Sequence, residues 1–185
     1  MRAEYPLAAV EVWAEDEHRV GLKPILRRVW AWRGVRPVVR VRPRYEWVWV
    51  YAFVHPETGR TEWLMLPRVD KELMGIALKR FARAVGAGPR KRVVLVLDQA
   101  GWHKAKDLRV PEGIHLEFLP AYSPELQPAE RLWPLTNEGL ANRAFSTIAE
   151  LERATADRIV RINHEVVRRL TRYYWWPRTT TPLQA

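Results

Sequence analysis

Hydrophobic side chains recur along the chain with two periods, and the shorter period marks the strands. Alternation of apolar and polar positions, or a short apolar run between turn residues, is typical of a strand. Segment 45–54 is apolar at both parities and segment 92–97 is a continuous Val/Leu run, so both are expected inside the sheet, the second as a buried parallel strand. The predicted strands are residues 8–14, 29–32, 45–54, 62–66, 92–97 and 114–119.

The longer period, of three to four residues, predicts the helices. One helix follows Asp70, which suits an N-cap, and ends before the Gly/Pro-rich segment 86–89. A second is expected to start near Pro128, because proline suits a first helical turn. Thr147 and Glu150 form a capping box ahead of one long amphipathic helix that reaches residue 170. This order of elements predicts an α/β layer fold with a mixed sheet.

Composition narrows the class of protein. With 185 residues and 48% hydrophobic side chains, the chain suits one globular domain. It has no cysteine, no secretory signal and no apolar run near the roughly 20 residues that span a bilayer. We therefore expect a cytoplasmic protein without a membrane partner. The net charge of +10 favours a polyanionic partner, usually nucleic acid, although a basic surface that binds nothing gives the same count.

Two acidic residues stand where predicted strands end: Asp16 after the first strand and Asp98 after the buried one. Ligands bind at the ends of neighbouring strands in open α/β sheets, and two carboxylates there repel each other unless a cation lies between them. Mg²⁺ prefers such oxygen ligands. From the residues alone, either aspartate equally suits a turn. Glu15 and Glu17 compete with Asp16, whose parity with Val12 places it on the inward face.

Four motifs carry a resemblance to a known family. They are residues 13–21 (WAEDEHRVG), 28–37 (RVWAWRGVRP), 97–104 (LDQAGWHK) and 119–133 (LPAYSPELQPAERLW). In this order they resemble the DDE endonuclease domain of mariner-superfamily transposases, in particular the bacterial insertion sequence 630 group. The resemblance covers residues 12–143 and implies an RNase H-like fold, with a mixed five-stranded sheet flanked by helices. It also implies cut-and-paste transposition by metal-dependent cleavage and strand transfer of DNA.

The family's functional residues carry over position by position. Asp16, Asp98 and Glu130 become the three catalytic carboxylates and the ligands of two divalent ions, Mg²⁺ or Mn²⁺. Two such ions about 4 Å apart can activate an attacking oxygen and stabilise the leaving 3′ oxygen of a phosphodiester. The implied partners are transposon-end and target DNA, with a dimer expected on DNA because two ends must be joined. A prokaryotic, nucleoid-associated protein is the corresponding expectation.

The assignment of Glu130 as the third acid rests mainly on the resemblance. Glu125 and Glu138 lie nearby, but neither aligns with the family acid. Taken alone, Glu130 equally suits the first turn of a helix, where a negative charge meets the helix dipole. Pro134 falls inside the expected helix, so that helix is either kinked or begins later.

Several other residues are candidate contacts. Gln99 and Gln127 stand where the family has asparagine, and each keeps an amide. His103, five residues after Asp98, either contacts phosphate or metal-bound water, or is a turn histidine. Candidate DNA or auxiliary contacts are Lys104, Lys106 and Arg19, with a solvated charged turn as the alternative for the two lysines.

The C-terminal third has a basic face and an aromatic end. The basic face is either a DNA track or an ordinary solvated surface. Its residues are Arg153, Arg158, Arg161, Arg168, Arg169 and Arg172. Trp47 and Trp49 are expected in the core, whereas Trp175 and Trp176 could serve a partner interface.

The expected organisation is a catalytic domain over residues 1–172 and a tail over residues 173–185. Family members carry helix-turn-helix modules before the catalytic domain, and the first acid here already stands at residue 16. A separately encoded helix-turn-helix subunit is therefore one expectation. The alternatives are a catalytically weak or inactive remnant that binds DNA or oligomerises, and an RNase H-like nuclease that acts on RNA or hybrids.

Overall fold

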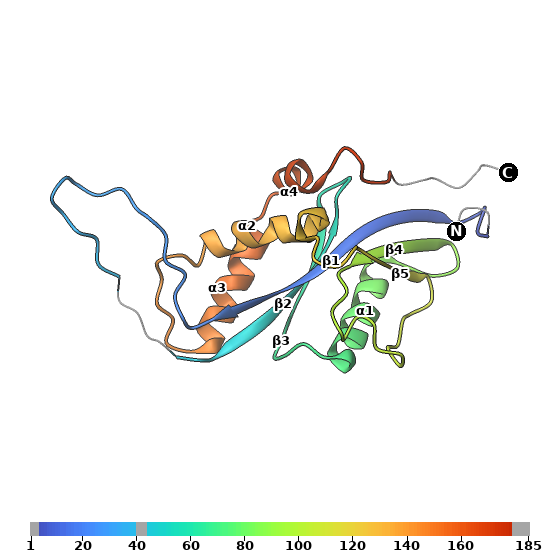
Figure 1. The fold of residues 1–185 in the computed structure, drawn as a ribbon, viewed down its shortest axis with the longest axis horizontal. Helices are drawn as coiled ribbons and strands as arrows, with labels where there is room; N and C mark the ends of the chain where they lie inside the picture. Colours follow the sequence, from blue (N-terminus) through green and yellow to red (C-terminus); the bar gives the residue numbers. More distant parts are fainter. Residues whose placement is uncertain (1–3, 40–43, 179–185) are drawn as a thin grey trace.

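The protein is built around a mixed β-sheet. The computed structural model describes residues 4–39 and 44–178. The five strands of the sheet lie in the order β3-β2-β1-β4-β5 (Figure 1). They are β1 (Ala9–Gly21), β2 (Trp47–His55), β3 (Arg60–Leu66), β4 (Lys91–Leu97) and β5 (Ile114–Phe118). The β1–β2 and β2–β3 pairs are antiparallel, and the β1–β4 and β4–β5 pairs are parallel. The predicted mixed five-stranded sheet is confirmed.

β1 is longer than its hydrophobic pattern predicted, which changes the position of Asp16. The first half of β1 pairs with β4 as far as the Ala14–Val96 pair, and the second half pairs with β2. Asp16 lies inside this second half opposite Ala52, so the prediction that it closes the strand was wrong. Main-chain pairing with β2 keeps the polar segment extended. Because β4 stops at Leu97, Asp16 still lies beside the carboxyl end of β4.

Helix α1 (Lys71–Val85) covers one face of the sheet (Figure 1). The Asp70 side chain accepts a hydrogen bond from the Leu73 amide, and Gly86 ends the helix in the left-handed conformation, as predicted. The apolar side of α1 packs on the sheet, where the rings of Phe53 and Phe81 stack with centroids 4.2 Å apart. This packing makes one of the two hydrophobic clusters found among the described residues.

The opposite face is covered by the C-terminal elements, which form a second hydrophobic cluster with the sheet. These elements are the 3₁₀ turns η1 (Pro124–Leu126) and η2 (Pro128–Arg131) and the helices α2 (Leu132–Glu138), α3 (Ile148–Val160) and α4 (His164–Thr171). Pro134 lies in the first turn of α2. Of the two alternatives for this region, the later helix start is therefore correct.

The single long helix predicted up to residue 170 was wrong, because the chain breaks between α3 and α4. The N-cap at its start is confirmed, since the Thr147 side chain accepts from the Glu150 amide. The Glu150 side chain accepts from the Ser146 amide, one residue earlier than a capping box requires. The break occurs at Asn163, whose side-chain oxygen accepts hydrogen bonds from the Glu165 and Val166 amides and so starts α4. Asparagine competes well for such bonds at a helix start.

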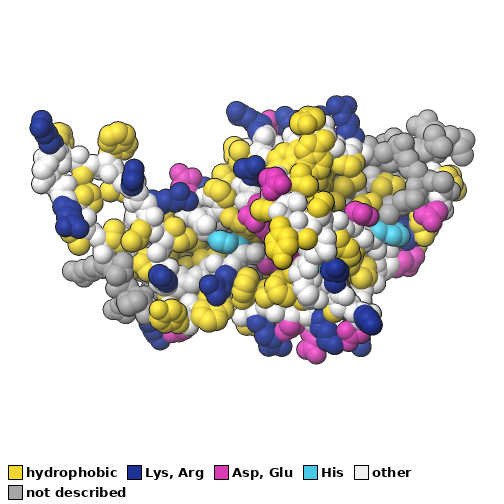
Figure 2. All heavy atoms as spheres, in the orientation of Figure 1, with side chains coloured by type: hydrophobic (Ala, Val, Ile, Leu, Met, Phe, Trp, Pro, Cys, Tyr) yellow, Lys and Arg dark blue, Asp and Glu magenta, His cyan; other side chains and the backbone are white. Residues whose placement is uncertain are grey.

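The described residues between β1 and β2, 22–39 and 44–46, form an arm that extends away from the sheet (Figure 1). The short strand predicted at residues 29–32 was wrong: the described part of the arm contains no strand. Trp30 and Trp32 are almost fully exposed there. Residues 40–43 of the arm lie outside the described residues. Figure 2 shows basic side chains both on this arm and along the edges of the main body.

Of the four tryptophans expected in the core or at an interface, Trp47 and Trp176 are placed differently from the predictions. Trp47 is 43% exposed and Trp49 only partly buried, so the core assignment fails for Trp47. Trp176 is buried in the hydrophobic cluster of the C-terminal face, which makes it unavailable to a partner, whereas Trp175 is 41% exposed. Residues 179–185 of the predicted tail lie outside the described residues. No helix in the described part of the chain is both long and apolar enough to cross a membrane.

Candidate active site

Asp16, Asp98 and Glu130 line one cleft of about 480 Å³. They reach it from the middle of β1, from the end of β4 and from η2, although they are far apart in the sequence. The rest of the lining comes from the residues that follow β4 and β5: Gln99, Ala100, Leu119, Pro120, Ala121, Tyr122, Ser123, Pro124 and Gln127. The structure thus brings together all three acids of the predicted triad.

The side chain of Asp16 is held by a hydrogen bond from a tryptophan of α2. Trp133 Nε1 donates to Asp16 Oδ2 at 2.7 Å, and the Trp133 ring stacks on His18 at 4.9 Å. Burial, together with the charges of Glu130 and Glu17, raises the pKa of Asp16 to about 7, against the opposing effect of the Trp133 hydrogen bond. A carboxylate with so high a pKa needs a compensating positive charge to remain ionised at neutral pH.

Asp98 begins the loop after β4, and one of its oxygens is bound tightly. Asp98 Oδ1 accepts from the Ala100 amide at 2.9 Å and lies 2.8 Å from His103 Nδ1. The bond from His103 lowers the pKa of Asp98, so this carboxylate is ionised at neutral pH. Hydrogen bonds within the described part of the chain leave Asp98 Oδ2 free.

Glu130 projects from η2 and is more exposed than Asp16. Burial, and then the charge of Asp98, raise its pKa, while Arg131 opposes them. Neither rival acid lines the cleft: Glu125 is exposed in η1, and Glu138 lies 3.8 Å from Arg158. Geometry therefore favours Glu130 as the third acid.

Two glutamines fix the walls of the cleft, a role that the sequence did not reveal. Gln127 is buried, and its Nε2 donates to the carbonyl oxygen of Glu15 at 2.9 Å, next to Asp16. Gln99 Nε2 donates to the carbonyl oxygen of Leu119 at 2.8 Å. These bonds tie the loops to the sheet. The sequence signal was the amide at each position, but the acceptors lie 112 and 20 residues away.

His103 lies in the turn after β4, as one of its two alternatives predicted, but its side chain is buried and does not line the cleft. Its side chain is fully buried behind Asp98, with Nε2 3.1 Å from Glu17 Oε1. Burial alone would lower the pKa of His103, but its bonds to Asp98 and Glu17 outweigh that effect and raise the pKa. His103 thus links the catalytic candidate Asp98 to an acidic cluster on the α1 side of the sheet.

The other candidate contacts lie at the surface. Lys104 Nζ donates to Gln99 Oε1 at 3.1 Å, and Lys106 is exposed. The guanidinium of Arg19 lies over the Trp47 ring, 5.2 Å from its centroid. None of these three residues lines the cleft.

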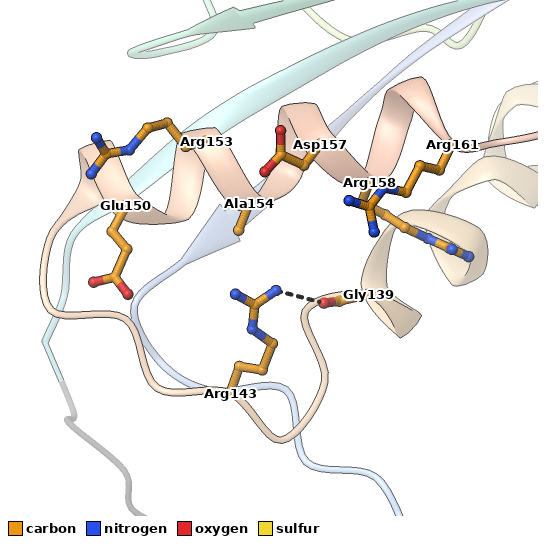
Figure 3. Close-up of a pocket in the computed structure, with 8 residues that line it drawn as sticks. All are labelled: Gly139, Arg143, Glu150, Arg153, Ala154, Asp157, Arg158 and Arg161. Atoms are coloured by element: carbon orange, nitrogen blue, oxygen red, sulfur yellow. Dashed lines mark hydrogen bonds between the residues drawn. The ribbon is translucent and has the colours of Figure 1, made fainter.

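A second, basic pocket of about 520 Å³ lies against α3 (Figure 3). Arg153, Arg158 and Arg161 project from the helix, while Arg143 reaches toward it from the preceding loop and donates to the Gly139 carbonyl oxygen at 3.2 Å. The pocket also contains Glu150 and Asp157. Arg153 and Arg161 make no ion pair with any described residue, so their charge is available to an anion.

The fold and the clustered carboxylates define an RNase H-like nuclease domain. The chain belongs to the DDE superfamily endonuclease family, whose sequence profile matches residues 11–152. An uncharacterized protein, y4pE/y4sA, of Sinorhizobium fredii (strain NBRC 101917 / NGR234) is 42% identical over 100 residues, which are 54% of this chain and 73% of that protein.

Solved structures of the Mos1 mariner transposase share the fold. Its catalytic domain matches with a TM-score of 0.58 and 18% identity, over 86% of this chain and 74% of that one. The Mos1 paired-end complex with Mn gives 0.63 and 20%, over 86% and 51%. The complex with Mg gives 0.63 and 17%, over 86% and 50%. The chain thus spans about half the length of the Mos1 chains in these complexes.

Proposed function

We propose that this chain is the catalytic domain of a cut-and-paste DNA transposase. In this proposal Asp16, Asp98 and Glu130 hold two divalent ions, Mg²⁺ or Mn²⁺, for strand cleavage and strand transfer. The observation that carries the proposal is the meeting of the three acids in one cleft of a DDE superfamily endonuclease. The Mos1 complexes with Mn and Mg support the choice of metal.

The donor set fits hard divalent cations. All three candidate ligands are carboxylates, and Mg²⁺ is typically bound through one or two carboxylates together with water and phosphate oxygens. Burial, and after it the charges of neighbouring carboxylates, raise the pKa values of Asp16 and Glu130, and a bound cation would offset both effects. When bound, such ions activate the attacking oxygen and stabilise the leaving 3′ oxygen.

The protein's own side chains position the reacting groups. Trp133 and His103 each hold one oxygen of an aspartate, so Asp16 and Asp98 are oriented before DNA arrives. Preorganised groups cost little reorganisation during the reaction. Water as the attacking group gives strand cleavage, and a DNA 3′ hydroxyl gives strand transfer, with the same carboxylates serving both. No covalent protein–DNA intermediate is required in this scheme.

The basic pocket on α3 is a candidate contact for the DNA backbone. Its unpaired arginines offer planar, charged donors that suit phosphate oxygens. We propose that DNA bound in the cleft extends over this pocket. A dimer on DNA and a separately encoded helix-turn-helix subunit belong to the same proposal, since two ends must be found and joined.

The test is cleavage of duplex DNA by the full chain, with and without Mg²⁺. We expect nicked or cut product only with Mg²⁺ or Mn²⁺, and weaker cleavage of RNA–DNA hybrid. Salt-sensitive DNA binding without any metal-dependent product would instead support an inactive DNA-binding remnant. Preferential cleavage of hybrid would support a nuclease that acts on RNA.

A further inference from the structure

An acidic cluster lies behind the cleft, on the α1 side of the sheet. Alternation along β1 points Glu15 and Glu17 away from the cleft, since Asp16 points to Trp133 on the other side. His103 Nε2 lies 3.1 Å from Glu17 Oε1 and 3.6 Å from Glu15 Oε2. The side chains of Glu15 and His103 are completely buried, and that of Glu17 is 4% exposed.

Glu15 is the member of this cluster whose side chain has no hydrogen bond within the described residues. The two imidazole nitrogens of His103 face Asp98 and Glu17, and Trp102 Nε1 also donates to Glu17. Both oxygens of Glu15 are buried without a hydrogen-bond partner. An ionised Glu15 would be a buried charge without a donor, and a protonated Glu15 would carry a hydroxyl without an acceptor. Either state is costly.

We propose that Glu15, Glu17 and His103 bind a divalent cation of the zinc type, separate from the ions of the cleft. One ligand atom from each residue lies within 4.8 Å of the other two. Donor atoms about 2.1 Å from a tetrahedral ion lie about 3.4 Å apart. The 3.1 and 3.6 Å distances from His103 Nε2 bracket this value. An imidazole in the donor set favours Zn²⁺ or Co²⁺ over Mg²⁺.

This site connects to the cleft through His103. A histidine that binds a metal through one nitrogen commonly donates its other N–H to a carboxylate, which fixes the ring. Asp98 is in this position, with Oδ1 2.8 Å from His103 Nδ1. The buried cation therefore fixes the orientation of Asp98 from behind while leaving its second oxygen for the cleft.

Co²⁺ is the probe, because it takes zinc-like geometry and absorbs visible light in a way that reports its ligands. The full chain is titrated with Co²⁺ in excess Mg²⁺, which occupies oxygen-only sites. We expect one Co²⁺ per chain with the spectrum of a nitrogen-containing site. Glu15→Gln should lower its affinity at least tenfold, whereas the neighbouring Asp16→Asn, the same change on the opposite face, should leave it unchanged. Glu15→Gln keeps the size of the buried side chain, and the folding of the variant is checked by circular dichroism. Glu17→Gln gives a second test.

Three results would overturn the inference: no Co²⁺ bound by the natural chain, binding that survives in both Glu15→Gln and Glu17→Gln, or binding lost in Asp16→Asn. If a buried water, and not a cation, satisfies Glu15, the natural chain will bind no Co²⁺. The proposal is independent of the proposed function. A chain that cleaves DNA in Mg²⁺ but binds no buried Co²⁺ refutes only this site, and one that binds Co²⁺ but never cleaves DNA refutes only the function.

Discussion

Asp16 and Asp98 show how neighbouring carboxylates acquire opposite properties from their surroundings. Burial and the charges of Glu130 and Glu17 raise the pKa of Asp16 to about 7, while the bond from His103 lowers the pKa of Asp98. The sequence indicated both residues through a strand pattern and a motif. It could not indicate Trp133 or Gln127 as their supports, since those contacts join residues 117 and 112 positions apart and exist only once the sheet has formed.

The raised pKa of Asp16 makes the stability of the metal-free protein depend on pH. A carboxyl with a higher pKa in the folded state takes up a proton on folding, so its cost is small at low pH and grows as pH rises toward about 7. We expect Asp16→Asn to stabilise the chain more at pH 8 than at pH 5, by about 2 kcal/mol in the free energy of unfolding.

Urea denaturation in EDTA at the two pH values measures this difference. Glu125→Gln is the control, because it makes the same kind of change at an exposed position in η1, outside the cleft. An Asp16→Asn effect that is equal at both pH values would contradict the raised pKa.

At the scale of elements, the hydrophobic pattern predicted the strands of the sheet and α1 well but not the break between α3 and α4. Both helices pack on the same side of the sheet, so the apolar spacing continues through the break and hides it. The local signal was Asn163, a strong N-cap in the middle of an apparently regular helix. The extension of β1 was missed for a related reason: pairing with β2 overrides the polar character of residues 15–19.

The turn between β2 and β3 supports α4 through Gly59. Gly59 has a φ of +75°, and a Cβ there would lie 1.9 Å from the His164 carbonyl oxygen. Gly86 has a similar φ of +71°, but a Cβ there meets nothing within 4 Å. We expect Gly86→Ala to cost about 1 kcal/mol from backbone conformation alone. Gly59→Ala should cost at least about 2 kcal/mol more, because backbone atoms must move. Equal losses in urea denaturation would show that α4 does not pack against this turn.

For the molecule as a whole, the net charge could be counted from the sequence, but its distribution over the surface could not. The net charge of +10 predicted a polyanionic partner, and the fold then gathers four arginines around one pocket on α3. The strand predicted at residues 29–32 of the arm was wrong, because this Trp/Val-rich segment has the composition of a strand. In the described structure no neighbouring strand pairs with it. Hydrophobic composition alone cannot distinguish an exposed arm from a sheet strand.

If DNA crosses the α3 pocket, its arginines should contribute to the salt dependence of binding. Each phosphate contact contributes about 0.9 to the slope of log K against log salt. We expect the double variant Arg153→Gln/Arg161→Gln to lower this slope by up to about 2 and to weaken DNA binding. Arg80→Gln/Arg83→Gln removes the same charge from the exposed side of α1 and serves as the matched control. Equal losses in the two double variants, measured by fluorescence anisotropy, would mean that only net charge matters.

In the proposed mechanism, Asp16, Asp98 and Glu130 hold the metal ions as one unit. The most direct measurement is the rate of Mg²⁺-dependent DNA cleavage by Asp98→Asn, by Glu130→Gln and by the double variant, with Glu125→Gln as control. Groups that act as a unit are strongly non-additive. We expect each single change to lower the rate at least about 100-fold, the double variant to be little worse, and the control to cleave normally. Normal cleavage by Glu130→Gln, or loss of cleavage in Glu125→Gln, would contradict it.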